Sequence, residues 1–170
     1  MAANPGGSQL IAVDSNVLFD LAQGQDDVVD SVSLIRERLA LAKFLMPPTV
    51  LQEVASWALQ GDIDKQAVAR NAIETAKTLR IIPVNLISIH SGISARVAAR
   101  LREVRLLPDQ EVDDSLIVAE SALLGCSILL TSDEHLRGID FERLTFELQS
   151  FDVSVPLIAT PREIVRKFFR

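Results

Sequence analysis

The stretch 10–19 constrains the fold most, because an apolar run is interrupted there by a short polar group. Residues 10–13 are apolar, Asp14, Ser15 and Asn16 are polar, and the apolar pattern then resumes. Such a run predicts a buried strand that carries Asp14 at its C-terminal end. In open α/β sheets, ligands bind in the crevice beyond the C-terminal ends of the strands. Asp14 is therefore the first candidate functional residue.

Short apolar runs alternate with helical patterns along the chain, which favours an α/β sandwich around a mostly parallel sheet. Strands are expected at 9–13, 45–47, 80–84, 127–130 and 153–158. Apolar positions at three- and four-residue spacing predict helices over 16–21, 31–44, 50–59, 62–79, 91–106 and 112–124, and a last one from 160. The segment 141–151 fits either a strand or a helix. Thr49, after two prolines, is expected to cap the helix that follows it.

The composition indicates one globular domain. The chain has 170 residues, of which 48% are apolar, which is enough for a sizeable core. No apolar run approaches the roughly 18 residues that span a membrane, and the first residues lack the positive charge of a secretory signal. The single cysteine, Cys126, excludes an intrachain disulfide and is expected in the core. We therefore expect a cytoplasmic protein with no membrane partner, a flexible lead-in over 1–8 and one domain over 9–170.

Acidic residues recur where an apolar segment meets a loop or a helix start. Asp14 and Asp133 each follow an apolar run, so both should stand at the same edge of a parallel sheet. Glu53 lies in the first turn of a predicted helix, and Asp113-Asp114 opens a strongly apolar one. Acids at helix N-termini also complement the helix dipole by about 0.3–1 kcal/mol, so each acid alone has a structural explanation. Gathered at one edge, however, they would repel one another unless a cation such as Mg²⁺ or Mn²⁺ bound them.

These motifs, in this order, resemble the PIN domain, a family of metal-dependent nucleases. The resemblance rests on Val-Asp-Ser-Asn-Val-Leu (13–18), Thr-Val-Leu-Gln-Glu-Val (49–54), Val-Asp-Asp-Ser-Leu-Ile-Val-Ala (112–119), Ile-Leu-Leu-Thr-Ser-Asp (128–133) and a closing Thr-Pro-Arg-Glu-Ile-Val (160–165). Each motif is short, but four in the right order are fairly specific, and together they cover about residues 9–168. The resemblance implies a three-layer α/β/α sandwich, in agreement with the alternating pattern.

The resemblance also implies the residues of the site. Carried over position by position, it implies a catalytic centre that holds Mg²⁺ or Mn²⁺ with the carboxylates of Asp14, Glu53, Asp114 and Asp133. Asp113 stands where many members have asparagine, so it is a spare ligand or a group that supports the ligands. Asn16 and Ser132 (or Thr131) match small polar positions that orient the acids in the family.

Substrate phosphates need positive partners. Arg96 and Arg100 are four residues apart and share a helix face, which makes them the best candidates, although an ordinary solvated face stays the alternative. Further cations lie on the same helix and at the C-terminal end, at Arg102, Arg105, Arg162, Arg166, Lys167 and Arg170. His90 and His135 are expected in surface or capping roles, with His135 near enough to the site to touch substrate. The acidic stretch 24–33 is longer than the resemblance predicts, and it is expected to be a solvated loop, with a lid or a partner-binding edge as the alternatives.

The leading interpretation is a ribonuclease in which no side chain acts as the nucleophile. The resemblance implies either the toxin of a bacterial toxin–antitoxin pair, with an antitoxin over the site, or a stand-alone nuclease, and in both cases a homodimer. A net charge of −6, the lack of tyrosine and a single tryptophan leave one alternative open, a catalytically silent PIN-like interaction module. A phosphoryl-accepting receiver domain would need a lysine at the end of a late strand, and the sequence has none there.

Overall fold

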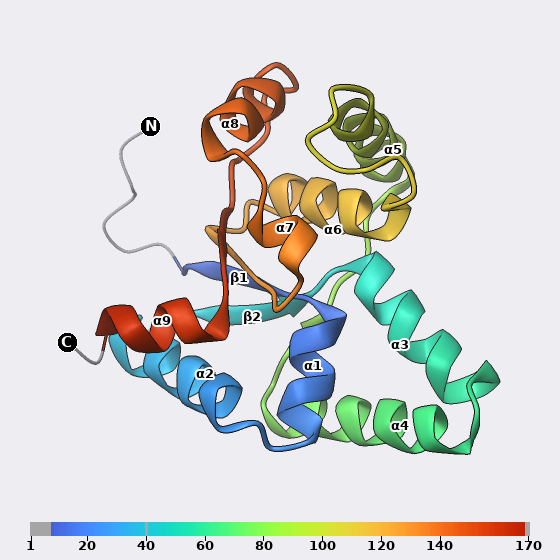
Figure 1. Ribbon diagram of the computed structural model, residues 1–170, viewed down its shortest axis with the longest axis vertical. Coiled ribbons are helices and arrows are strands. Elements are labelled where there is room, and N and C mark those ends of the chain that lie inside the picture. The colour runs from blue at the N-terminus through green and yellow to red at the C-terminus, as the bar shows by residue number, and fades with distance from the viewer. Residues whose placement is uncertain (1–7, 40, 169–170) are drawn as a thin grey trace.

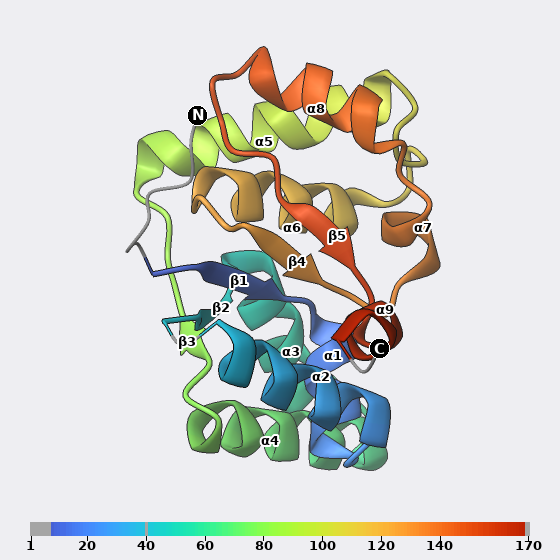
Figure 2. The same ribbon diagram turned by 90° about the vertical axis from the view of Figure 1, so that its left-hand side faces the viewer.

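A five-stranded parallel sheet with helices on both sides forms the centre of the computed structural model, which describes residues 8–39 and 41–168 (Figures 1 and 2). The strands are β1 (Leu10–Val13), β2 (Lys43–Met46), β3 (Ile82–Pro83), β4 (Ile128–Leu130) and β5 (Leu157–Ala159). Their order is β3-β2-β1-β4-β5, and each neighbouring pair is parallel. The α/β/α sandwich expected from the sequence is confirmed.

Helices connect every pair of consecutive strands. They are α1 (Ser15–Ala22), α2 (Asp26–Arg38), α3 (Pro48–Gln60), α4 (Ile63–Thr78), α5 (Ser88–Glu103), α6 (Val112–Leu123), α7 (Glu134–Arg137), α8 (Phe141–Gln149) and the closing α9 (Pro161–Phe168). Both views place α5 and α6 on one side of the sheet and α2 and α4 on the other (Figures 1 and 2). Crossovers between parallel strands are right-handed, so the direction in which the chain moves along the sheet decides which face its helices cover. This direction reverses after β3, and the later helices therefore cover the other face.

The reversal places the topological switch point between β1 and β4. From β1 the chain builds outward through β2 to β3, and it then returns to the other side of β1 to add β4 and β5. Val13 pairs with Leu130 at the ends of β1 and β4, and the Asp14 amide donates to the Leu130 carbonyl at 3.0 Å. Ligands of doubly wound sheets bind at such a point. The fold therefore places Asp14 where a ligand site is expected.

The two central strands are buried on both faces, as the strands of a parallel sheet usually are. The consecutive residues 11–13 of β1, and 129–130 of β4, have no exposed surface, and consecutive side chains of a strand point to opposite faces. Cys126, just before β4, is a buried free cysteine, as expected. Burial raises the pKa of its thiol to about 12, so the thiol is unreactive.

The acidic stretch 24–33 is not a solvated loop, and that expectation was wrong. α2 begins at Asp26, and its two first-turn aspartates complement the helix dipole. Val28 and Val32 on the same helix are buried against the core. α2 ends at Arg38, so the helix expected over 31–44 is displaced toward the N-terminus, and β2 begins at Lys43.

Several other boundaries differ from the expectations. The segment 141–151 is helical as α8, and its Asp140 cap accepts hydrogen bonds from two backbone amides. β5 is shorter and later than 153–158, and β3 keeps only two residues at the sheet edge, where Pro83 is tolerated. α5 begins at Ser88, so the exposed His90 lies in its first turn. The cap expected at Thr49 is wrong, because Pro47 holds the N-cap position of α3.

Within residues 8–39 and 41–168, no helix combines the length and the apolar character needed to cross a membrane. Most of the expected lead-in, residues 1–7, lies outside the described residues. The division of the chain at residue 9 therefore stays a prediction.

Candidate metal centre

Asp14 joins the end of β1 to the start of α1. Its carboxylate accepts hydrogen bonds from the amide of Ser15 and from the hydroxyl of Thr131, both at 2.7 Å. The residue is only 1% exposed, and this burial is the main cause that raises its pKa from 3.8 to about 6. The two hydrogen bonds lower the pKa, while the negative charges of Glu53 and Asp133 raise it. Asp14 therefore has two other acids of the expected site as electrostatic neighbours.

Thr131 holds two of the acids with one hydroxyl. The hydroxyl donates to Asp14 at 2.7 Å and accepts a hydrogen bond from the backbone amide of Asp133 at 3.0 Å. Thr131 itself has no exposed surface, so this link between the ends of β1 and β4 is sheltered from water. The hydroxyl of the neighbouring Ser132 instead donates to Asp20, at 3.2 Å. Of the two alternatives from the sequence, Thr131 is thus the one that contacts the acids.

Asp114 lies half-buried in the first turn of α6. Its pKa is raised from 3.8 to about 7, first by burial and then by the negative charges of Asp133, Asp14 and Glu111. The positive charge of protonated His135 lowers the pKa. The acids that act on Asp114 come from the ends of two strands and from the loop before α6. The structure therefore brings these segments together around Asp114.

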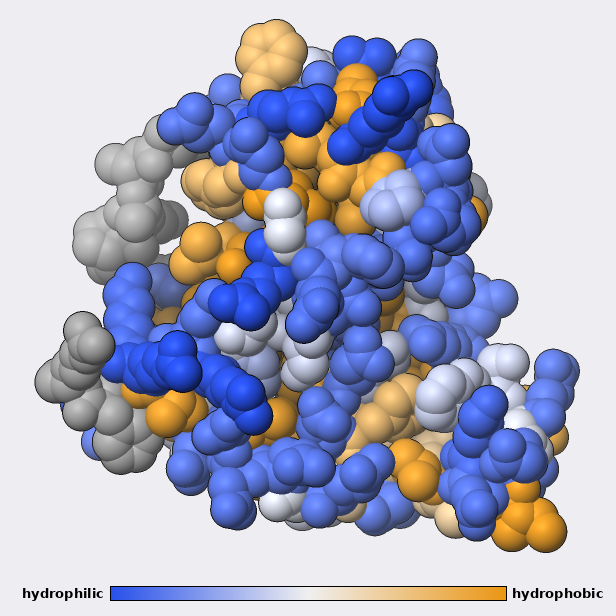
Figure 3. All heavy atoms as spheres, in the orientation of Figure 1, coloured by the Kyte–Doolittle hydropathy of each residue, from blue (hydrophilic) through white to orange (hydrophobic). Residues whose placement is uncertain are grey.

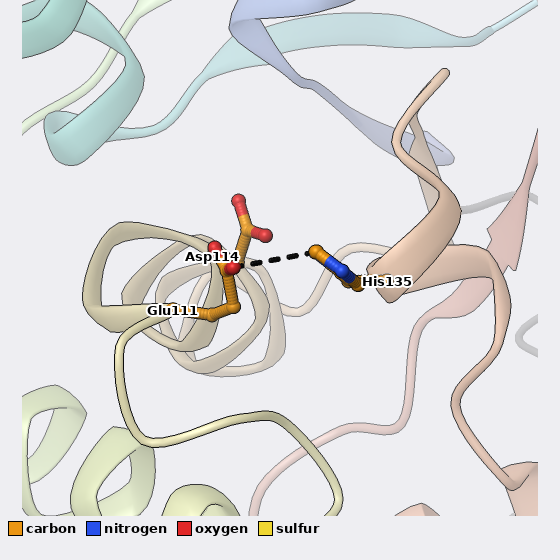
Figure 4. Close-up of side chains that lie close together, drawn as sticks. All are labelled: Glu111, Asp114 and His135. Carbon is orange, nitrogen blue, oxygen red and sulfur yellow. Dashed lines mark ion pairs between the residues drawn. The ribbon is translucent and has the colours of Figure 1, made fainter.

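Glu111, Asp114 and His135 form a cluster that could hold a metal ion. One candidate ligand atom from each residue lies within 4.8 Å of the others, and the two acids project from the start of α6 toward His135 on α7 (Figure 4). The Nδ1 atom of His135 is 3.3 Å from Glu111 Oε1 and 3.9 Å from Asp133 Oδ1. Carboxylates suit Mg²⁺ and Mn²⁺, whereas imidazole prefers transition metals. The cluster therefore offers two oxygen donors and one nitrogen donor to a divalent ion.

Glu53 and Asp113 differ in their surroundings from the two strand-end acids. Glu53 is partly buried in the second turn of α3, rather than the first, and its charge acts on Asp14. Asp113 is exposed, and its negative charge acts on Glu120 of the same helix. Asn16 is also exposed, in the first turn of α1. The roles expected for Asp113, as a spare ligand or a supporting group, and for Asn16, as an orienting group, stay predictions.

The two arginines expected to contact substrate lie on α5. Arg96 is exposed there. The Arg100 guanidinium already pairs with Glu147 of α8 at 2.8 Å and with Glu103 at 3.3 Å. These carboxylates raise the pKa of Arg100, so it is held in an ion pair between helices.

A polar groove with a volume of about 380 Å³ adjoins Asp133, since both chain neighbours of Asp133 line it. Its other walls come from α1, α2, α7 and α9, and its charged lining consists of Asp20, Asp27, Glu134, Arg137, Arg162, Glu163 and Arg166. Arg137 pairs with Glu163 at 3.3 Å and Arg162 with Asp27 at 2.9 Å, all on exposed side chains. Hydrophilic side chains dominate the centre of the face seen in Figure 3. The acids thus adjoin a surface suited to a polar ligand.

Sequence reasoning missed Glu111 and treated His135 as a capping or surface residue. Glu111 precedes Asp114 by three residues, a spacing that places two side chains on one side of a helix start. That spacing was the available signal. The position of His135 just after Asp133 placed it near the site, but its contact with Glu111 depends on how α6 and α7 meet.

A profile of the PIN domain family matches residues 11–142. The chain belongs to the PIN domain family. Members of this family are generally nucleases. This PIN domain has a fold similar to VapBC2 from Rickettsia felis, solved bound to a DNA fragment from its promoter, with a TM-score of 0.63, 10% identity, and coverage of 89% of this chain and 98% of that one. The fold is also similar to VapBC-1 from nontypeable Haemophilus influenzae, with a TM-score of 0.56, 13% identity, and coverage of 90% of this chain and 98% of that one.

A comparison with curated protein sequences gives no match for this PIN domain. At the identities of the two structural neighbours, the likeness shows a shared fold. The family assignment confirms the resemblance drawn from the four sequence motifs.

Proposed function

We propose that this PIN domain is a ribonuclease that hydrolyses RNA phosphodiester bonds with Mg²⁺ or Mn²⁺. The observation that carries the proposal is the electrostatic coupling of acids that are far apart in the sequence. Asp14 and Asp114 have pKa values of about 6 and 7, to which the charge of Asp133 contributes in both cases. Such a group of oxygen donors fits a hard divalent cation, whose charge would offset the repulsion among them.

The chain's own residues would hold the ligands in place. Thr131 fixes Asp14 and the backbone of Asp133 with one buried hydroxyl. We propose that Glu53 and Asp114 complete the ligand set, with Asp113 as a spare ligand and Asn16 and Thr131 as orienting groups. A divalent ion bound there supplies an activated water and stabilises charge on the phosphate oxygens. No side chain then needs to act as the nucleophile.

Arginines on two surfaces are proposed to bind the phosphates of the RNA strand. Arg96 and Arg100 on α5 form the first pair, although Arg100 would have to leave Glu147 and Glu103. Arg162 and Arg166 in the groove beside Asp133 form the second. We favour the groove as the phosphate-binding surface. Its lining includes Ser132 and Glu134, which are the chain neighbours of Asp133.

The biological role proposed here is that of a toxin whose site an antitoxin protein covers. Its support is the fold shared with the VapBC proteins of Rickettsia felis and Haemophilus influenzae. A homodimer and a cytoplasmic location belong to the same proposal. Co-purification of a partner encoded beside this chain would test it.

RNA cleavage by matched variants tests the enzymatic proposal. Purified wild type, Asp14→Asn and Asp114→Asn are incubated with single-stranded RNA, with and without Mn²⁺. Asp64→Asn is the control, because Asp64 is likewise an acid in the first turn of a helix, α4. We expect Mn²⁺-dependent cleavage by the wild type and the control, and a loss of more than about 100-fold in the two site variants. Cleavage that persists in Asp14→Asn would contradict the site, and Mn²⁺ binding without cleavage would favour the silent interaction module.

A further inference from the structure

We propose that Glu120 of α6 is a positioning residue, which sets the orientation of Glu53 by capping α3 through Thr49. The inference rests on the proposed metal-dependent function, because Glu53 matters here as a metal ligand. Its basis is a pair of buried hydrogen bonds between the two helices that carry Glu53 and Asp114.

α3 begins without a capping side chain of its own. Pro47 occupies the N-cap position and Pro48 the first helical position, and no side-chain hydrogen bond from the N-cap satisfies the free amides of the first turn. Glu120 takes over this role from another helix. Its Oε2 accepts from the Thr49 amide at 3.0 Å, and its Oε1 accepts from the Thr49 hydroxyl at 2.8 Å. A carboxylate at a helix N-terminus also complements the helix dipole.

The contact is sheltered from water on both sides. Glu120 is 5% exposed and Thr49 is 8% exposed. A buried carboxylate is costly unless its oxygens accept hydrogen bonds, and here Thr49 supplies a bond to each oxygen. Burial nevertheless raises the pKa of Glu120, and the charge of Asp113 adds to this. The two hydrogen bonds from Thr49 therefore offset part of the cost of burying this carboxylate.

The geometry of the helices connects that task to the metal centre. Thr49 and Glu53 are four residues apart, so they lie one turn apart on the same face of α3. Glu120 lies on the same helix as Asp114, less than two turns further along. Fixing Thr49 to Glu120 therefore fixes the rotation of α3 about its axis relative to α6. The distance between the carboxylates of Glu53 and Asp114 follows from this rotation.

Mn²⁺ affinity measured by calorimetry tests the inference, together with kcat and KM for RNA cleavage. Glu120→Ala removes both acceptors, and we expect it to weaken Mn²⁺ binding about 10-fold and to lower kcat while KM for RNA stays within about 2-fold. Glu120→Gln should restore binding to within about 3-fold of the wild type. Its carbonyl oxygen can accept from the Thr49 amide, and its amide nitrogen can donate to the Thr49 hydroxyl.

Ser121→Ala is the matched control, because Ser121 is fully buried and its hydroxyl donates to the Ile117 carbonyl within α6. It disturbs α6 without removing a contact to α3, so its Mn²⁺ affinity should stay at the wild-type value. Thr49→Val, which removes only the hydroxyl, should weaken binding about 3-fold and serves if Glu120→Ala does not fold.

The outcomes separate this inference from the proposed function. Wild-type Mn²⁺ affinity in Glu120→Ala and Thr49→Val, or equal losses in Glu120→Ala and Ser121→Ala, would overturn the role of Glu120 alone. An absence of Mn²⁺ binding in the wild type would overturn the metal-dependent function and the inference with it. Loss in Glu120→Ala with recovery in Glu120→Gln supports the inference.

Discussion

Asp14 is more favourably buried as a neutral acid than as a carboxylate. Its pKa in the folded protein, about 6, lies above the ordinary value of 3.8. The folded state therefore binds this proton more tightly than the unfolded state does. The resulting stabilisation is fully present below pH 3.8 and is lost as the pH rises through about 6. Without metal, the charged carboxylate destabilises the fold at neutral pH.

Asp14→Asn should remove this penalty. The amide can still accept a hydrogen bond from Ser15 and can bond with Thr131, but it carries no charge. In EDTA at pH 8 we expect the variant to melt about 5 °C above the wild type, and at pH 4 to melt within about 1 °C of it. Differential scanning calorimetry measures both. A variant that melts below the wild type at pH 8 would contradict the assigned burial cost.

RNA cleavage should depend on pH through the same groups. Asp14 and Asp114 must lose their protons to bind a cation, so kcat/KM at a fixed, subsaturating Mn²⁺ concentration should rise between pH 6 and pH 8. The apparent pKa values belong to the coupled group rather than to one residue. Raising the Mn²⁺ concentration should move the rise to lower pH. If the pH midpoint of kcat/KM did not change with Mn²⁺ concentration, that result would contradict competition between protons and metal at these acids.

The sequence predicted site residues whose place depends on a single helix or strand. It missed residues whose role depends on how two helices pack against each other. Asp14 and Asp133 could be placed because each follows a short apolar run that reads as a buried strand. Adjacent residues of a helix point about 100° apart, so Asp113 and Asp114 cannot share a direction. The sequence pattern does not say which one faces the strand ends. Glu120 was missed because its partner, Thr49, lies on a different helix.

The elements that were misjudged each combine two conflicting patterns. In α2 the acidic first turn suggested a loop, although Val28 and Val32 already show helical spacing. In α8 the apolar residues alternate as in a strand, but Leu144 and Leu148 are buried while Phe146 is 72% exposed. The buried pair is four residues apart, which is the helical spacing. The strands are only two to four residues long, so periodicity could not fix their ends.

The burial of α2 gives a test of its structural role. Val32 is 3% exposed, whereas Val29 on the same helix is 42% exposed. Val32→Ala should lower the free energy of unfolding by about 2 kcal/mol, because it leaves a cavity in the core. Val29→Ala is the control and should lower it by less than about 0.5 kcal/mol. Urea denaturation measures both, and equal small effects would indicate that α2 is not packed as described.

The whole molecule has a net charge of −6, yet it carries arginines beside its acids. Its sheet order could not be derived from the pattern of strands alone, since that pattern fits several orders. The order decides that β1 and β4 are neighbours, and hence that Thr131 can link Asp14 to Asp133. Local patterns could not predict that these acids come together, whereas the resemblance of the motifs to the PIN family did predict a shared site.

Salt dependence of RNA binding tests how the whole molecule engages its substrate. If Arg166 contacts a phosphate, Arg166→Ala should weaken binding to an uncleavable RNA at low salt for every sequence tried. The slope of log affinity against log salt should become shallower by about 0.7. Arg96→Ala tests the α5 surface in the same way. Slopes unchanged in both variants would exclude these two residues from the phosphate contacts.

The central claim is that the strand-end acids Asp14 and Asp133 bind one divalent metal ion together with Glu53 of α3 and Asp114 of α6. An anomalous difference map from a crystal soaked in MnCl₂ tests it most directly. We predict a peak at about 2.2 Å from carboxylate oxygens of Asp14, Glu53, Asp114 and Asp133. A peak coordinated only by other acids, or none at these residues while Mn²⁺ binds elsewhere, would contradict it.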